Sequence, residues 1–235
     1  MNKMNVKIFA DGADKESMKT MYGQDYIDGL TTNPTLMRNA GIENYEDFCK
    51  DILTFIKTKP ISFEVFSDDF DEMYRQAKII SAWADNIYVK VPITNTKGDY
   101  SYDLIKKLSN EGVKVNVTAI MTKTQIKNTI SSLKDDCPAY VSVFAGRIAD
   151  TGQDPIDIMK YAVEQTSSLP NVEIIWASPR ELLNIVQADQ IGCHIITVTP
   201  DILKKLNKIG YSLDDYSLDT VKMFYDDAVS AGYTL

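Results

Sequence analysis

The chain has 235 residues, of which 44% are hydrophobic and 25% charged, and this composition is ordinary for a globular protein with one sizeable core. Its net charge of −8 and its lack of basic runs argue against binding to nucleic acid or to a membrane surface. The three cysteines are far apart, there is one histidine, and no apolar run is long enough for a signal peptide or a membrane span. We therefore expect no disulfide framework, no metal site and a cytoplasmic location.

Short β-branched segments alternate along the chain with longer segments of helical period. The expected strands are 5–11, 28–33, 61–66, 87–92, 113–120, 139–146, 172–178 and 193–199. A helix is expected within 68–85, with Ser67 or Asp68 as its N-cap. Gly112 and Gly192 fall between a helix and a strand, where a left-handed C-cap is expected.

Strict alternation of strands and helices predicts parallel strands joined by right-handed crossovers. Eight such units predict an α/β fold, a single-domain (β/α)8 TIM barrel over residues 1–235. A doubly wound open sheet is the alternative, but "FADGADKE" after the first strand lacks the G-x-G-x-x-G fingerprint. Residues 217–231 are predicted to form an additional C-terminal helix, which either caps the barrel or docks on a neighbouring subunit.

Polar residues recur near the C-terminal ends of the expected strands, where (β/α)8 barrels place their active sites. In the third to sixth strands the intervening positions are almost wholly apolar, so the polar positions are predicted to face the barrel interior. These polar residues are Asp11, Thr31, Asn33, Glu64, Lys90, Asn116, Thr118, Ser142 and Ser178. Any one of them alone could be a satisfied core residue, but their agreement over seven strands favours one shared site.

Lys90 is the least expected of these residues, because an ammonium group in a core strand is costly to bury. Desolvation lowers the pKa of a lysine, and the neutral amine attacks a carbonyl to form a Schiff base. Asp11 and Glu64 would supply the proton transfers that such chemistry needs. This combination predicts a metal-free, aldolase-type reaction. A pyridoxal-phosphate enzyme would also need such a lysine, but nothing else in the sequence asks for that cofactor, and we expect none.

Two arginines follow the sixth and seventh strands, on loops at the same face of the barrel. Arg147 lies in "FAGRIAD", and Arg180 lies in "WASPRE" beside Ser178. Two guanidinium groups and a hydroxyl suit a phosphate, although either arginine alone could form a surface ion pair. The single histidine, His194, lies in a segment that looks like a core strand, and a structural role is favoured for it.

The chain resembles the transaldolase family, especially its short members, which include fructose-6-phosphate aldolases. The resemblance runs from about residue 6 to 231 and rests on "FADGA", "GLTTNPTL", "FEVF", "IYVKVPIT", "VNVTAIMT", "SVFAGRIAD" and "ASPRE". It implies that Lys90 forms the Schiff base with a ketose donor and that Asp11 is the acid/base for C–C cleavage. Glu64 and Thr118 would hold a proton-relaying water. The implied substrate-binding residues are Thr31, Asn33, Asn116, Ser142, Arg147, Ser178 and Arg180, the last three for the phosphate.

Two activities occur within this family, namely transfer of a dihydroxyacetone unit to an aldose and release of free dihydroxyacetone. Glu64, Asn116, Phe144 and the Ser178-x-Arg180 spacing follow the transaldolase pattern, and the aldolase subgroup tends to have a tyrosine where Phe144 stands. Transfer is therefore the prediction and release the alternative. A barrel that only binds sugar phosphates is an alternative of another class. Pro179 departs from the usual residue and leaves the sugar open. The resemblance also implies a homo-oligomer.

Overall fold

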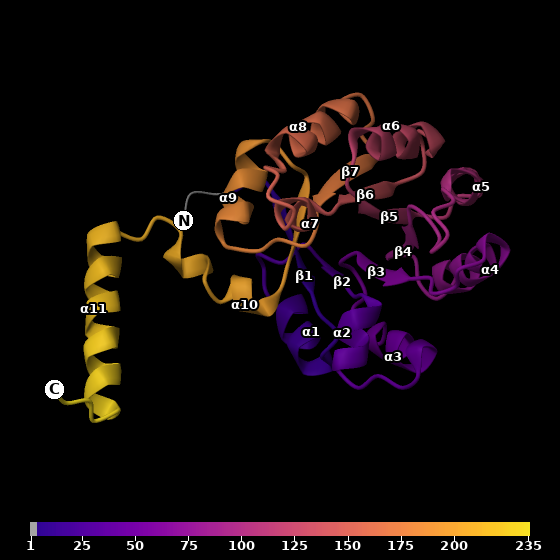
Figure 1. Cartoon of the computed structure of the whole chain (residues 1–235). Helices are drawn as coiled ribbons and strands as arrows, with labels where there is room; N and C mark the ends of the chain where they lie inside the picture. Colours follow the sequence, from indigo (N-terminus) through magenta and orange to yellow (C-terminus); the bar gives the residue numbers. More distant parts are fainter. Residues whose placement is uncertain (1–3) are drawn as a thin grey trace.

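Eight parallel strands close into a barrel in the order in which they occur along the chain (Figure 1). The computed structural model describes residues 4–235. The strands are β1 Lys7–Asp11, β2 Gly29–Thr31, β3 Ile61–Glu64, β4 Ile87–Pro92, β5 Val115–Ile120, β6 Ala139–Val143, β7 Val172–Trp176 and β8 Ile195–Val198. Because β1 pairs with β8, the predicted TIM barrel is confirmed and the open sheet is wrong.

Helices surround the barrel and connect its strands (Figure 1). They are α1 Lys15–Tyr22, α2 Pro34–Asn39, α3 Tyr45–Ile52, α4 Phe70–Ser81, α5 Tyr102–Asn110, α6 Lys123–Ser132, α7 Ala145–Ala149, α8 Ile156–Gln165, α9 Leu183–Gln190, α10 Pro200–Leu203 and α11 Leu213–Ser230, with a 3-10 turn at Leu206–Lys208. Several strands end earlier than predicted, and after β2, β6 and β8 a helix begins within three residues. Asn33, expected on the second strand, instead caps α2, with Pro34 in its first turn.

The start of α4 differs from the prediction by one or two residues. Its N-cap is Asp69, whose Oδ1 accepts the Glu72 N–H at 2.9 Å, and not Ser67 or Asp68. Asp68 instead accepts hydrogen bonds from the Thr96 backbone and hydroxyl at 2.6 and 2.7 Å. The left-handed glycines are confirmed, with φ of +78° at Gly112 and +71° at Gly192.

The protein has two apolar clusters, one between the strands and the helices and one inside the barrel. Valines on the outer side of the strands, such as Val89, Val91 and Val115, are fully buried among the helices. Each such side chain contributes roughly 1.5–3 kcal/mol to stability. Inside the barrel lies a second apolar cluster, the apolar plug, formed by Phe9, Tyr140, Ile175, Ala177 and Ile195, with Tyr88 and Phe144 packed against it. It extends from the starts of β6 and β8 to the end of β7.

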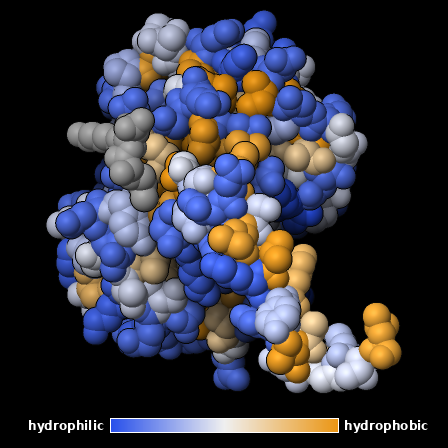
Figure 2. All heavy atoms as spheres, turned by 90° about the vertical axis from the view of Figure 1, so that its left-hand side faces the viewer, coloured by the Kyte–Doolittle hydropathy of each residue, from blue (hydrophilic) through white to orange (hydrophobic). Residues whose placement is uncertain are grey.

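The last helix, α11, stands apart from the barrel (Figure 1). It begins at Leu213, four residues before the predicted start, and Ser212 caps it by accepting the Asp215 N–H. None of its residues is buried, so the idea that it caps the barrel is wrong. Viewed from the side of α11, Figure 2 shows apolar side chains on the molecular surface. Those exposed on α11 include Leu213, Leu218, Val221, Phe224, Tyr225 and Val229.

The remaining expectations on composition concern thiols, the histidine and membranes. Cys49, Cys137 and Cys193 are buried free thiols, as expected. His194 precedes β8, and its Nδ1 accepts the Ile174 N–H at 3.0 Å, which is a structural role. Within residues 4–235, no helix combines the length and apolarity needed to cross a bilayer.

Candidate active site

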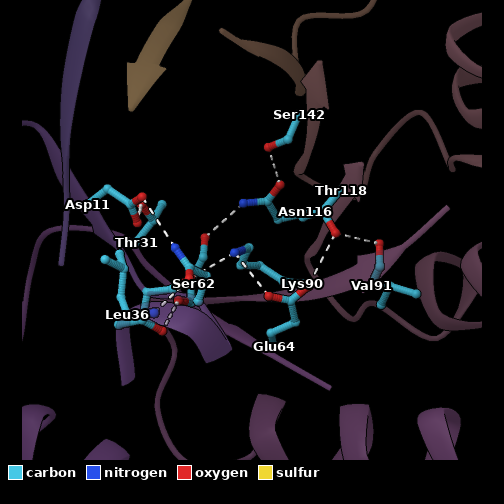
Figure 3. Close-up of polar contacts among 12 residues, drawn as sticks. Asp11, Thr31, Leu36, Ser62, Glu64, Lys90, Val91, Asn116, Thr118 and Ser142 are labelled. Carbon is cyan, nitrogen blue, oxygen red and sulfur yellow. Dashed lines mark hydrogen bonds and ion pairs between the residues drawn. The ribbon is translucent and has the colours of Figure 1, made fainter. Parts of the chain in front are cut away.

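Lys90 lies at the centre of a polar network at the C-terminal end of the barrel (Figure 3). Strand register places Glu64 of β3 beside Lys90 of β4, and Lys90 beside Asn116 of β5. The Lys90 ammonium donates to the Thr32 carbonyl at 2.7 Å and lies 3.2 Å from Glu64 Oε2. Only 8% of Lys90 is exposed. A lysine buried this far is tolerated because both contacts offset its lost hydration.

Thr118 lies on the other side of the same carboxylate. Its hydroxyl donates to Glu64 Oε1 at 3.4 Å (Figure 3). The next residue, Ala119, has a φ of +61°, and the register with β6 shifts between Val117 and Ile120. A left-handed alanine is strained, and such strain concentrates at functional sites. The irregularity in β5 sets the direction in which Thr118 enters the site.

Asp11 forms a second acidic centre with the end of β2. It accepts the Thr31 hydroxyl at 2.9 Å and the Asn33 amide at 3.4 Å. Because Asn33 also caps α2 through Leu36 N at 2.9 Å, its amide orientation is fixed. Burial raises the pKa of Asp11 above its ordinary value, although the positive charge of Lys90 and the Thr31 hydrogen bond work in the opposite direction. A carboxyl with a raised pKa is suited to exchange protons near neutral pH.

A chain of buried hydrogen bonds orients the amide of Asn116. Ser142 donates to Asn116 Oδ1 at 2.7 Å, and Asn116 Nδ2 donates to Ser62 Oγ at 3.0 Å (Figure 3). Sequence reasoning predicted Asn116 and Ser142 but missed Ser62. Its signal was present, because Ser62 lies two residues before Glu64 and so points to the same side of β3.

Ser178 and Arg180 come together after β7, but not in the way predicted. β7 ends at Trp176, and its inward residues are Ile175 and Ala177. Ser178 follows with a left-handed backbone, at a φ of +59°. Arg180 then donates to Ser178 Oγ at 2.9 Å.

The charge of Arg180 is paired with a residue that sequence reasoning missed. Its guanidinium binds both oxygens of Asp150, with Nε 2.8 Å from Oδ1. The hydrogen bonds from Arg180 lower the pKa of Asp150, and nearby Arg147 lowers it further. Arg147 is itself exposed and has no ion pair within residues 4–235. Arg180 therefore joins Ser178 to Asp150, and the charge of Arg147 acts on the same carboxylate.

Phe144, which follows β6, is the predicted site residue that separates the two activities of the family. It is half-buried at the N-cap of α7 and packs against the apolar plug inside the barrel. Its side chain has no hydrogen-bonding group, which makes this wall of the site dry.

Two other observations bear on where chemistry takes place. A cavity of about 630 Å³ lies near the N-terminal ends of β3, β4 and β5, lined by residues such as Trp83, Tyr88 and Lys114, and contains none of the predicted site residues. We therefore identify the candidate site from the chemistry of its side chains and not from the size of a cavity. No cluster of three or more potential metal ligands occurs in the part of the chain from Met4 onward.

The fold and the site together define a (β/α)8 barrel with a lysine–carboxylate centre at the C-terminal ends of its strands. A family profile described as "Transaldolase/Fructose-6-phosphate aldolase" matches residues 8–234. A protein named "Probable transaldolase" from Nitrosopumilus maritimus is 35% identical over 226 residues, covering 93% of this chain and 96% of that protein. Another of that name from Herpetosiphon aurantiacus is 32% identical, covering 92% of both. The chain belongs to the transaldolase/fructose-6-phosphate aldolase family.

More distant solved structures share the barrel alone. A putative lyase/mutase from Burkholderia cenocepacia superposes with a TM-score of 0.58 at 12% identity, covering 84% of this chain and 77% of that one. The structure of KGPDC from Streptococcus mutans gives a TM-score of 0.57 at 9% identity, with 88% of this chain and 93% of that one covered. At these identities the likeness concerns the fold and carries nothing about the reaction.

Proposed function

We propose that this protein is a transaldolase-type transferase that moves a dihydroxyacetone unit from a ketose phosphate to an aldose phosphate through a Schiff base on Lys90. The observation that carries the proposal is the buried Lys90 ammonium 3.2 Å from Glu64, with Thr118 on the other oxygen of that carboxylate. Family membership supports it, because the relatives are named probable transaldolases.

In the proposed first stage, Lys90 attacks the C2 carbonyl of the ketose. The ammonium must lose a proton before it attacks, and Glu64 is the carboxylate placed to accept it. The C–N bond then forms, and the carbinolamine oxygen leaves as water after protonation. Glu64 and Thr118 would relay these protons through a bound water. The product is a protonated imine, which withdraws electrons from the adjacent carbons.

In the second stage, the C3–C4 bond breaks. Asp11 takes the proton from the C4 hydroxyl while the bonding electrons move into the imine and form an enamine. The aldose phosphate leaves, another aldose phosphate takes its place, and the same steps run in reverse. A raised pKa suits Asp11 to accept a proton and return it. Asn33 and Asn116 would bind the hydroxyls of the donor.

The sugar phosphate would lie over Arg147, Ser178 and Arg180. Arg180 already contacts Ser178, and the charge of Arg147 lowers the pKa of Asp150, the partner of Arg180. Guanidinium groups with an adjacent hydroxyl bind phosphate oxygens well. The carbon chain would then extend from this exposed region toward Lys90 in the interior.

Trapping the imine tests the proposal directly. The protein is incubated with a panel of ketose phosphates and borohydride, and the modified peptide is identified by mass spectrometry. We expect an adduct on Lys90 and no adduct in Lys90→Met. A barrel that only binds sugar phosphates would instead show ligand-dependent thermal shifts, without turnover and unchanged in kind by Lys90→Met.

A lyase that releases free dihydroxyacetone is the second candidate, and we propose that Phe144 favours transfer over release. Release requires protonation of the enamine carbon, and a phenylalanine offers no hydrogen bond to a water there. We therefore expect product only when an aldose acceptor is added. Phe144→Tyr should increase acceptor-independent release, and an unchanged ratio of release to transfer would show that Phe144 does not control this choice.

A further inference from the structure

We propose that Tyr45 is a positioning residue for this reaction, because its hydroxyl holds the backbone of Glu64 and thereby sets the carboxylate beside Lys90. The inference rests on the proposed function, since it assigns Glu64 to proton transfer. Tyr45 lies on α3, outside the barrel interior, and no sequence motif points to it.

The contact consists of two hydrogen bonds to one residue. The Tyr45 hydroxyl donates to the Glu64 carbonyl at 2.7 Å and accepts the Glu64 N–H at 2.8 Å. It therefore satisfies both polar groups of that peptide backbone. Burial raises the pKa of Tyr45, so the hydroxyl keeps its proton, and its donor role, over the working pH range.

The ends of the neighbouring strands explain why Glu64 needs such a partner. Backbone groups along β3 alternate between its two neighbours. Ser62 accepts from Thr32 on the β2 side at 3.3 Å, and Val65 donates to Lys90 on the β4 side at 3.1 Å. The Glu64 backbone thus faces β2, but β2 has already ended at Thr31. The Tyr45 hydroxyl takes the place that the next residue of β2 would occupy.

The tyrosine is itself held in place. Asn44 caps α3 by accepting the Asp47 N–H at 3.1 Å, which fixes the helix start where Tyr45 lies. The Tyr45 ring packs edge-to-face on Phe66, with ring centroids 5.2 Å apart. Phe66 follows Glu64 by two residues, so the Tyr45 ring and the Tyr45 hydroxyl both contact the C-terminal end of β3.

The contact of Tyr45 with Glu64 affects the proposed proton transfer, because the Glu64 carboxylate lies 3.2 Å from Lys90 and 3.4 Å from Thr118. A displacement of the Glu64 backbone would lengthen both contacts. A displacement of about 1 Å in a catalytic group can cost about 100-fold in rate. Tyr45→Phe keeps the ring but removes both hydrogen bonds, and it frees the end of β3. We expect imine formation on Lys90 to slow by about 10- to 100-fold, with little change in KM.

Tyr22→Phe is the matched control. The Tyr22 hydroxyl also makes two hydrogen bonds, to Thr58 Oγ1 at 3.0 Å and from Lys57 N at 3.4 Å, but near the N-terminal end of β3. The hydrogen bonds of Tyr22 are exposed whereas those of Tyr45 are partly buried, so Tyr22→Phe should destabilise the fold less, and it should leave imine formation within about 2-fold of the wild type. Equal rates in the two variants would overturn the proposal.

A double-mutant cycle separates positioning from a general structural effect. If Tyr45 acts through Glu64, Tyr45→Phe should slow imine formation far less in a Glu64→Gln background than in the wild type. The same loss in both backgrounds would overturn the proposal. Hydrogen exchange of the Glu64 amide gives a readout that needs no activity, and Tyr45→Phe should accelerate it while Tyr22→Phe does not. If the wild type forms no adduct on Lys90, the proposed function fails, whereas an unaltered exchange rate in Tyr45→Phe shows that Tyr45 does not hold Glu64.

Discussion

Gly146 makes the phosphate region sensitive to a single methyl group. It is the second residue of α7, and a Cβ built on it would lie 1.6 Å from the Ser178 carbonyl oxygen and 3.3 Å from the Arg180 guanidinium carbon. Real Cβ contacts hardly ever fall below 3.0 Å. In Gly146→Ala the Ser178 carbonyl must therefore retreat by about 1.4 Å. Because this carbonyl is backbone, Ser178 and Arg180 must move with it.

The expected cost follows from that displacement. Moving a binding group by about 1 Å costs on the order of 100-fold, so kcat/KM for a ketose phosphate should fall by about 100-fold, or ~2.7 kcal/mol. Strain in the fold should cost a further ~1–3 kcal/mol of stability, partly offset by the ~1 kcal/mol by which alanine is the better helix former. The polar contacts of Lys90 are with Thr32 and Glu64 and not with Ser178 or Arg180, so borohydride trapping with unphosphorylated dihydroxyacetone should stay within about 2-fold of the wild type.

The assay compares phosphorylated with unphosphorylated donors in Gly146→Ala and in a control, Gly23→Ala. At Gly23 the added Cβ meets its nearest neighbour at 3.5 Å, an ordinary contact, so that variant should behave like the wild type. Equal losses for both donors in Gly146→Ala would mean that the methyl group disturbs the whole barrel. Unchanged kcat/KM for the phosphorylated donor would refute the placement of the phosphate at Ser178 and Arg180.

Three further predictions concern charge and assembly. Burial raises the pKa of Asp11, so the folded protein binds the carboxyl proton more tightly than the unfolded chain does. The protein therefore loses stability as the pH rises from about 4 through the folded pKa. Asp11→Asn should be more stable than the wild type in urea by ~1 kcal/mol at pH 8, and parallel curves of stability against pH for the two proteins would contradict this. Asp150 forms an exposed ion pair with Arg180, and its negative charge repels a phosphate dianion. Asp150→Asn should therefore lower KM for sugar phosphates by about 3- to 10-fold at low salt and by less at about 0.5 M salt. An unchanged KM would contradict the placement of the phosphate beside Asp150. We also propose that the apolar surface of α11 is covered by another copy of the chain. Truncation before Ser212 should leave a folded barrel with fewer copies per particle in sedimentation, and an unchanged number of copies would show that α11 mediates no assembly.

The parts of the site that lie within strands could be predicted from sequence because strands have a simple period. The inward direction of Lys90 and Glu64 follows from the alternation with Val89 and Phe63, which are buried among the helices. Asn33 was misplaced on a strand although Pro34 marks a helix start.

What lies between strands could not be predicted, because it depends on backbone turns and distant pairs. The left-handed turn at Ser178 has no glycine or asparagine to announce it. The pairing of Arg180 with Asp150 joins residues 30 positions apart. The contact of Tyr45 with Glu64 depends on where β2 stops, and strand ends are the least predictable feature of a sequence.

The site residues on strands and those between strands also differ in how easily they can be substituted. Lys90 is buried and bonded to Glu64 of β3 and to the Thr32 carbonyl just after β2, so a change at Lys90 disturbs these contacts and the packing together. The side chains of Arg147 and Arg180 are exposed, and substitution of an exposed side chain costs the fold little. In the proposed reaction, a sugar phosphate of different chain length must place its phosphate at a different distance from the imine on Lys90. We therefore propose that Arg180 and its partner Asp150 set the choice of sugar, while the role of Lys90 stays the same.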